Sequence, residues 1–205
     1  MTDLRTIDGQ ALSPEAERLM DYLRTRPAEV DAAGVRERVR AAAAELEKIV
    51  DSVPESDIRR RPIADKWNIA EVVDHIAQTQ IRSAEELRHL FAGRRPPGPP
   101  VYEALRSGAA AWAPWQELVD GLRSANQELI ELLKDAPGEA EKSGATVRTI
   151  LVINHALPSG GTGTQIFPAD LDWKQYALLQ RLHLLDHRTQ IKKLREALTS
   201  SAAAS

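Results

Sequence analysis

The sequence contains no cysteine among its 205 residues. A disulfide framework, a thiolate metal site and a cysteine nucleophile are therefore excluded, and any metal ion would have to bind to imidazole or oxygen. Aromatic residues make up only 4% of the chain, while stretches rich in alanine and leucine favour helices over strands. A chain of this length is expected to form one domain whose core is stable without cross-links.

The chain also lacks an excess of charge of one sign and any long apolar run. It holds 27 lysines and arginines against 30 aspartates and glutamates, so that the formal net charge is −3. Without a large basic field, nucleic acid is not expected as a partner. No run approaches the roughly 18 apolar residues of a membrane span, and the amino terminus is polar. We therefore expect a cytoplasmic protein that does not enter a membrane.

Helix signals divide the chain into a short amino-terminal arm and a bundle. Residues 1–30 form the predicted arm, with one amphipathic helix that starts at Pro14 and ends near Leu23. The bundle domain spans residues 31–199, and residues 200–205 are expected to form a disordered tail. Helix-forming residues, caps and a helical apolar period predict long helices at residues 35–50, 68–91, 115–133 and 172–198. The predicted fold is all-α, an antiparallel four-helix bundle.

Two stretches between these helices cannot continue them. Residues 94–100 are rich in proline, which removes amide donors, so a long crossover connection begins there. Residues 139–171 are predicted to be a long irregular segment in which only residues 146–153 have the β-branched density of a strand. The glycine-rich residues 159–163 are predicted to be flexible and able to fold over the mouth of the bundle.

The last predicted helix carries two histidines within its apolar face. Its apolar side chains fall within an arc of about 140° at about 100° per residue, and His183 and His187 lie inside that arc. A spacing of four places both imidazoles one turn apart on one face, where both can approach one ion. Buried imidazoles need partners for their nitrogens, and a divalent cation supplies one. Alternatively, both are core residues bonded to carbonyls or carboxylates, or they face a dimer partner.

Other polar residues are candidates for a part in the same site. Gln180 and Gln190 extend the line of the two histidines by one turn in each direction, where they can orient a ligand or a bound water. His75, on the second bundle helix, lies about 60° outside the apolar arc of that helix, which is typical of a flanking or solvent-facing histidine. His155 is interpreted as a surface or capping residue, with a fourth metal ligand as the alternative.

Two segments resemble the signature of the DinB/YfiT-like family. Residues 66–76, Lys-Trp-Asn-Ile-Ala-Glu-Val-Val-Asp-His-Ile, are similar to its tryptophan, helix cap and histidine in the second turn of a helix. Residues 183–191, His-Leu-Leu-Asp-His-Arg-Thr-Gln-Ile, are similar to its H-x-x-x-H-R-x-Q segment. The resemblance implies a four-helix bundle with a long connection between its second and third helices. It also implies a divalent metal, usually zinc or nickel, held by His75, His183 and His187.

Three histidine ligands leave one coordination position open, which is typical of a catalytic rather than a structural metal. The family includes metal-dependent hydrolases and transferases that use low-molecular-weight thiols such as bacillithiol or mycothiol. The resemblance therefore implies a metal-dependent enzyme that acts on a small molecule as a hydrolase or a thiol S-transferase. The alternative is a non-catalytic metal-binding or dimerising helical stress-response protein.

The sequence leaves the catalytic residues of such an enzyme open. Asp74, Asp186 and Glu71 are acidic candidates near the ligands, and Asp186 is favoured as support for a ligand rather than as a general base. Residues 59–61, three arginines, are either solvated or attract an anionic substrate. Trp67 is interpreted as a core or interface anchor. Exposed helical faces lead us to expect a homodimer.

Overall fold

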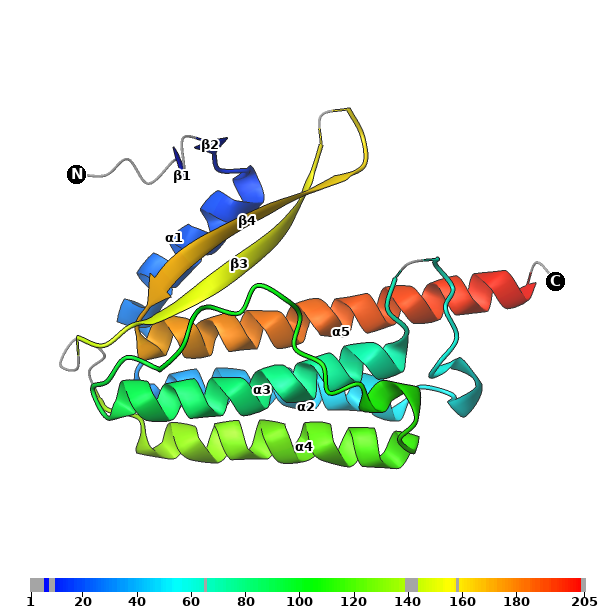
Figure 1. The fold of residues 1–205 in the computed structure, drawn as a ribbon, viewed down its shortest axis with the longest axis horizontal. Coiled ribbons are helices and arrows are strands. Elements are labelled where there is room, and N and C mark those ends of the chain that lie inside the picture. The colour runs from blue at the N-terminus through cyan, green and yellow to red at the C-terminus, as the bar shows by residue number, and fades with distance from the viewer. Residues whose placement is uncertain (1–5, 8–9, 65, 139–143, 158, 204–205) are drawn as a thin grey trace.

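The chain folds into a four-helix bundle that carries an additional helix and a β-hairpin on one side. The computed structural model describes residues 6–7, 10–64, 66–138, 144–157 and 159–203. The elements in chain order are β1 (Thr6–Ile7), β2 (Gln10–Ala11), α1 (Pro14–Glu29), α2 (Ala32–Asp51), η1 (Glu55–Asp57), α3 (Ile69–Phe91), η2 (Ala109–Ala111), α4 (Trp115–Leu132), η3 (Leu133–Asp135), β3 (Val147–Ala156), β4 (Thr162–Leu171) and α5 (Trp173–Ala203). Figure 1 shows α2, α3, α4 and α5 side by side, with α1 and the hairpin packed against α5. The prediction of four bundle helices is confirmed.

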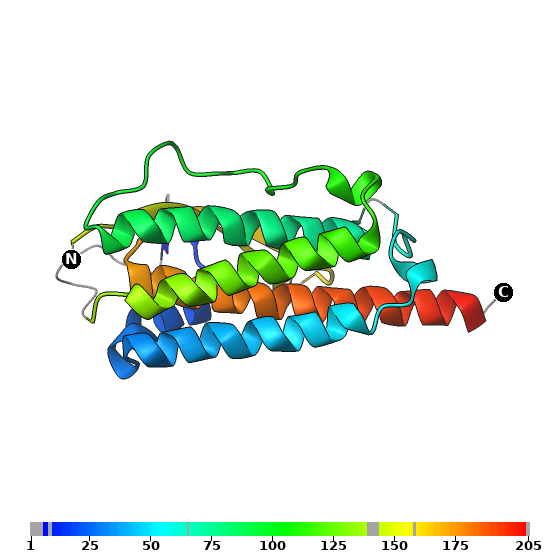
Figure 2. The same ribbon diagram turned by 90° about the horizontal axis from the view of Figure 1, so that it is seen from below.

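The bundle is not antiparallel throughout. Figure 2 shows that α3 and α4 begin at the same end of the bundle, and the contacts of Gln80 with Asn126 and of Arg88 with Glu128 join these helices in parallel. The antiparallel prediction is therefore correct for α3 with α5 and wrong for α3 with α4. Because α3 and α4 are parallel, residues 92–114 must return along the whole length of α3. This segment is the predicted long crossover connection.

A β-hairpin occupies the segment before the last helix that was predicted to be irregular, and its first strand, β3, covers most of residues 146–153, where strand density was predicted. β3 and β4 pair antiparallel over 10 residues each, so the all-α fold class is wrong in this part of the chain. Gly160 and Gly161 have φ angles of +85° and +88°, in the left-handed region that glycine adopts without strain, and they lie in the turn. Figure 1 shows the hairpin pointing away from the bundle rather than over its mouth.

The first helix is longer than predicted. The Ser13 hydroxyl accepts a hydrogen bond from the Ala16 amide at 3.2 Å, which confirms the predicted helix start. The helix continues past Leu23 and through Pro27 to Glu29. Leu23 is only 1% exposed, because α1 packs against α5 and β3. This packing outweighs the hydrogen bond that a proline removes from a helix.

The core consists of aliphatic side chains from all four bundle helices. Fully buried examples are Leu46, Ile76, Leu122 and Leu184. Beyond this core α5 extends to Ala203, into the range predicted as a tail, and residues 204–205 lie outside the described residues. None of the described helices is both long enough and apolar enough to cross a membrane.

Candidate metal centre

Three histidine side chains from two helices meet where α3 packs on α5. The Nε2 atom of His183 lies 3.1 Å from Nε2 of His75 and 3.0 Å from Nε2 of His187. One nitrogen from each ring lies within 4.8 Å of the others, so the group can hold a metal ion. Tetrahedral zinc with Zn–N bonds of about 2.0–2.1 Å separates its ligand nitrogens by roughly 3.4 Å. The structure thus brings together the three histidines that the family resemblance implied.

His75 is buried, with 9% exposure, although its place on the helical wheel indicated a flanking residue. The crossover segment explains the difference, since the carbonyl oxygen of Leu105 lies 2.9 Å from Nδ1 of His75. The neighbouring Asp74 accepts hydrogen bonds from the Ser107 hydroxyl and from the amides of Ser107 and Gly108. Two consecutive residues of α3 therefore fasten the crossover segment, and this segment covers His75.

Hydrogen bonds at Nδ1 fix how two of the rings present Nε2. The Nδ1 atom of His75 faces the Leu105 carbonyl at 2.9 Å, and that of His187 faces Oε1 of Gln190 at 2.7 Å. Because both partners are acceptors, each Nδ1 carries the proton and each Nε2 presents a lone pair toward His183. This is the form in which a neutral imidazole binds a metal. Gln190 thus contacts a site histidine, as predicted.

The surroundings of His183 favour a cation at the centre of the triad. Its Nε2 can donate one proton to only one of the two lone pairs that face it, and its buried Nδ1 has no hydrogen-bond partner in the part of the chain that the structure describes. A metal ion removes this conflict because all three lone pairs can then point at one positive charge. Gln180, the other amide predicted to support the site, is only 4% exposed, and its Oε1 has no hydrogen-bond partner among the described residues.

Burial keeps the three imidazoles in the neutral, metal-binding form. It lowers the pKa of His75 to about 4, against the opposing effect of the hydrogen bond to Leu105, and the positive charge of Arg106 lowers this pKa further. Burial also lowers the pKa of His183 well below its ordinary value. The pKa of His187 is lowered by burial as well, against the opposing effect of its bond to Gln190. At neutral pH, the triad therefore does not need to lose protons before it binds a metal.

The acidic candidates near the triad are engaged elsewhere or exposed. Glu71 accepts hydrogen bonds from Arg61 and from the amide of Asn68, with which it forms a capping box. Asp74 holds the crossover segment, and Asp186 is exposed and acts on the triad through its charge. Among the described residues, no carboxylate is hydrogen-bonded to a triad imidazole.

Trp67 packs against the core, as the sequence indicated, and it also belongs to the site. Its ring centroid lies 4.9 Å from that of His75 and 6.5 Å from that of His187, and its plane is tilted only 14° from the His187 ring. The indole therefore covers one side of the triad. His155, by contrast, lies on β3 outside the triad, with its Nδ1 3.4 Å from the carbonyl oxygen of Ala156.

Replacing Gln190 with leucine removes the acceptor that orients His187 and keeps a side chain of similar size. We expect the affinity for Zn²⁺ to fall about 10–100-fold, as is usual when a metal ligand loses its outer hydrogen bond. Calorimetric titration of chelator-treated protein measures this affinity. Gln127→Leu, on the exposed face of α4, is a matched control that should bind as the wild type does. Equal affinities for Gln190→Leu and the control would contradict an orienting role.

Replacing Asp74 with alanine leaves the hydroxyl of Ser107 and the amides of Ser107 and Gly108 without their acceptor. We expect the free energy of unfolding to fall by about 2–4 kcal/mol, because three charge-assisted hydrogen bonds to the buried Asp74 carboxylate are lost. Urea denaturation measures the change, and Asp120→Ala on the exposed face of α4 serves as the control. A stability equal to that of the control would show that Asp74 does not hold the crossover segment.

Comparisons with known proteins identify relatives of this fold and of the segment that contains His75. The family model of the DinB superfamily matches residues 38–155. The solved mycothiol-dependent maleylpyruvate isomerase matches with a TM-score of 0.56, and a histidine-to-alanine mutant of the same enzyme with 0.55. Each is 10% identical over 80% of this chain, and this chain covers only 61% of their length. A candidate DinB-family protein from Exiguobacterium sibiricum 255-15 is 18% identical to this chain and matches with a TM-score of 0.46. The match covers 82% of this chain and 91% of the length of that protein. A comparison with curated proteins gives no match.

The two kinds of match support different statements. At 10% identity, the likeness to the isomerase shows a shared fold and nothing about substrate. The family match extends from α2 into β3, covers more than half of the 205 residues and includes His75. The chain belongs to the DinB superfamily.

Proposed function

We propose that this protein is a metal-dependent enzyme whose divalent ion is held by His75, His183 and His187. The observation that carries the proposal is the meeting of the three Nε2 atoms, two of which present lone pairs toward the third. When bound, the ion supplies Lewis acidity that lowers the pKa of a coordinating thiol or water. Zinc and nickel are the metals we propose, because both suit imidazole ligands.

The residues around the triad prepare it for a small substrate. The Leu105 carbonyl and the Gln190 amide hold two rings in place, so the ligands need little rearrangement when the ion binds. Trp67 excludes water from one side of the rings. Three ligands leave one position of a tetrahedral ion for a substrate atom, which is the arrangement of a catalytic site.

Between the two reaction classes that the sequence left open, we favour transfer reactions that depend on a low-molecular-weight thiol. A hydrolase also needs a side chain that takes a proton from water, and no described carboxylate is hydrogen-bonded to the triad. A thiol-dependent enzyme does not need that group. The shared fold with a mycothiol-dependent isomerase supports the same choice at the level of fold alone.

A substrate panel tests the proposed function. It combines thiol conjugation with mycothiol or bacillithiol and hydrolysis of esters and amides, and it compares the wild type with His187→Ala. We expect thiol-dependent turnover in the wild type and none in His187→Ala, with His155→Ala, outside the triad, as the control. Turnover of esters without a thiol would assign the hydrolase class. Equal turnover in the wild type and His187→Ala would refute metal-dependent catalysis at this site.

The alternative of a non-catalytic metal-binding or dimerising protein makes a different prediction. Such a protein would bind the ion at the same three histidines and show no turnover with any substrate of the panel. The proposed homodimer is tested separately by light scattering on the protein as it elutes from a sizing column. A monomeric mass would contradict it.

A further inference from the structure

An open cavity of about 680 Å³ lies between the start of α3 and the crossover segment. The three histidines do not line it, but Asp74, which precedes His75 on α3, does, and so does Arg106, which follows Leu105 on the crossover segment. Three guanidinium groups, those of Arg59, Arg61 and Arg106, line its wall. A gathering of three arginines around one cavity beside a candidate metal centre suggests a role in binding.

Other groups hold two of these guanidiniums in fixed directions. Arg59 donates to the backbone carbonyls of Ala110 and Ala113, and Arg61 donates to a backbone carbonyl and to Glu71. A guanidinium has more N–H donors than these contacts use, so each arginine keeps donors for a further acceptor. Among the described residues, Arg59 has no carboxylate partner, and its positive charge is therefore not paired locally.

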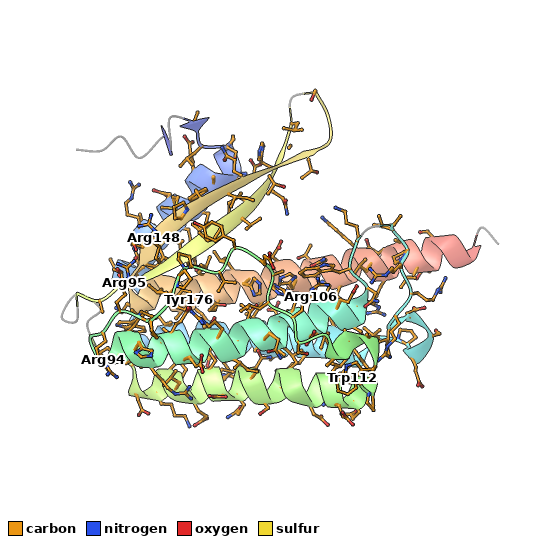
Figure 3. The ribbon with its side chains drawn as sticks, viewed as in Figure 1. Arg94, Arg95, Arg106, Trp112, Arg148 and Tyr176 are labelled. Carbon is orange, nitrogen blue, oxygen red and sulfur yellow. The ribbon has the colours of Figure 1, made fainter. Side chains whose placement is uncertain are left out.

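Arg106 connects the cavity to the candidate metal centre. Its guanidinium carbon lies 5.3 Å from the ring centroid of Trp67, and its closest carboxylate oxygen, on Glu71, is 3.8 Å away. The same indole ring lies 4.9 Å from the ring of His75, so a single side chain separates Arg106 from the triad. Figure 3 shows Arg106 on the crossover segment where this segment passes α3 and α5.

The acidic groups in the cavity wall do not use up these donors. Asp74 already accepts hydrogen bonds from Ser107 and Gly108. Glu71 is committed to Asn68 and Arg61, and although burial acts in the opposite direction these bonds lower its pKa. A third carboxylate, that of Glu103, also lines the cavity, so the wall holds three arginines and three acidic side chains. Each guanidinium has five N–H donors, and the donors that remain still outnumber the free acceptor oxygens, which favours binding of an oxyanion.

We propose that this cavity binds an oxyanion, a carboxylate or a phosphate group, of the substrate that reacts at the triad. The planar guanidinium fork matches the two oxygens of such a group, and two of the arginines are held in place before it arrives. The assignment of the anion to the substrate rests on the proposed function. The oxyanion site itself rests only on the cavity and its arginines.

Titration with succinate and with inorganic phosphate, in separate experiments at an ionic strength kept constant with chloride, tests the site. Metal-free protein is used first, so that the anion cannot bind to an ion instead. Because Arg106 lies against Trp67, we expect saturable quenching or enhancement of fluorescence that is absent in Trp67→Phe. The anion that binds more tightly identifies the group as a carboxylate or a phosphate.

Variants of Arg106 decide whether the cavity is the binding site. We expect Arg106→Gln to weaken binding by about tenfold or more, since a charge-assisted contact is lost. Arg106→Lys should keep part of the affinity, because lysine keeps the positive charge but lacks the planar guanidinium that donates two parallel hydrogen bonds. Arg18→Gln, on the exposed face of α1, removes an arginine far from the cavity and should bind as the wild type does.

Saturable binding that is lost in Arg106→Gln and kept in Arg18→Gln supports the proposal. No saturable binding of either anion, or equal affinity in Arg106→Gln and the wild type, overturns it. Metal content is measured on samples of the same preparation before the metal is removed. Bound metal without anion binding would overturn the oxyanion site and leave the proposal of a metal-dependent enzyme standing. Anion binding by a protein that holds no divalent ion would support the oxyanion site and overturn the proposal of a metal-dependent enzyme.

Discussion

Replacing His183 with alanine is expected to abolish stoichiometric metal binding. Its Nε2 lies within 3.1 Å of the Nε2 atoms of both other histidines, so its loss leaves an ion with two imidazoles on opposite helices. We expect the loss of affinity to exceed the roughly 10–100-fold effect of removing an outer hydrogen bond. Elemental analysis of protein purified without a chelator or an affinity tag measures the bound metal.

His155→Ala is the matched control, because it makes the same change at a histidine on β3, outside the triad. Circular dichroism separates loss of the site from loss of the fold, since the helical signal of His183→Ala should equal that of the metal-free wild type. Wild-type metal content in a folded His183→Ala variant would place the metal elsewhere in the protein.

The metal-free protein is expected to lose stability as the pH falls from about 6.5 toward 4. Burial lowers the pKa of His75 to about 4 in the folded chain and also lowers the pKa of His183 and of His187. In the unfolded chain a histidine titrates near a pKa of about 6.5. Between these values the unfolded chain binds more protons than the folded chain, so the free energy of unfolding rises with pH. His75 contributes up to about 1.4 kcal/mol per pH unit in this window and no further change above it, and His183 and His187 act in the same direction.

Urea denaturation of chelator-treated protein between about pH 5 and 7 measures this dependence, because carboxylates near their usual pKa are largely ionised over that range. His75→Gln should show a smaller slope than the wild type, since one of the titrating groups is gone. His155→Gln should keep the wild-type slope. A slope in the wild type no larger than in His75→Gln would mean that His75 is not held neutral in the folded protein.

Local interactions in the sequence determined the bundle helices and two of the three histidines of the candidate site. The predicted cap of Asn68 with Glu71 is present, and so is the similar pair of Asp172 with Gln175 at the start of α5. Both depend on residues three apart, which lie close together whenever a helix forms. The helical period also predicted that His183 and His187 share one face, for the same reason.

The second strand of the hairpin could not be predicted from its residues. β4 contains Gly163 and Pro168, both unfavourable in strands, and it has no regular alternation of apolar and polar residues. Its pairing with β3, in which Pro168 lies opposite Ile150, and the packing of the hairpin stabilise it instead. These interactions depend on the partner strand, so the propensity of the segment alone does not indicate them.

The sequence by itself determined, to within one residue, where α1, α3, α4 and α5 begin, and it determined which histidines of α5 face the same way. Only the tertiary structure decided that His75 is buried beside them and that three arginines surround a neighbouring cavity. Because α3 and α4 run parallel, the crossover segment must return along α3, where it covers His75 and places Arg106 at Trp67. The decisive contacts join residues 30 and 108 positions apart, and the spacing of neighbours along a helix carries no information about them.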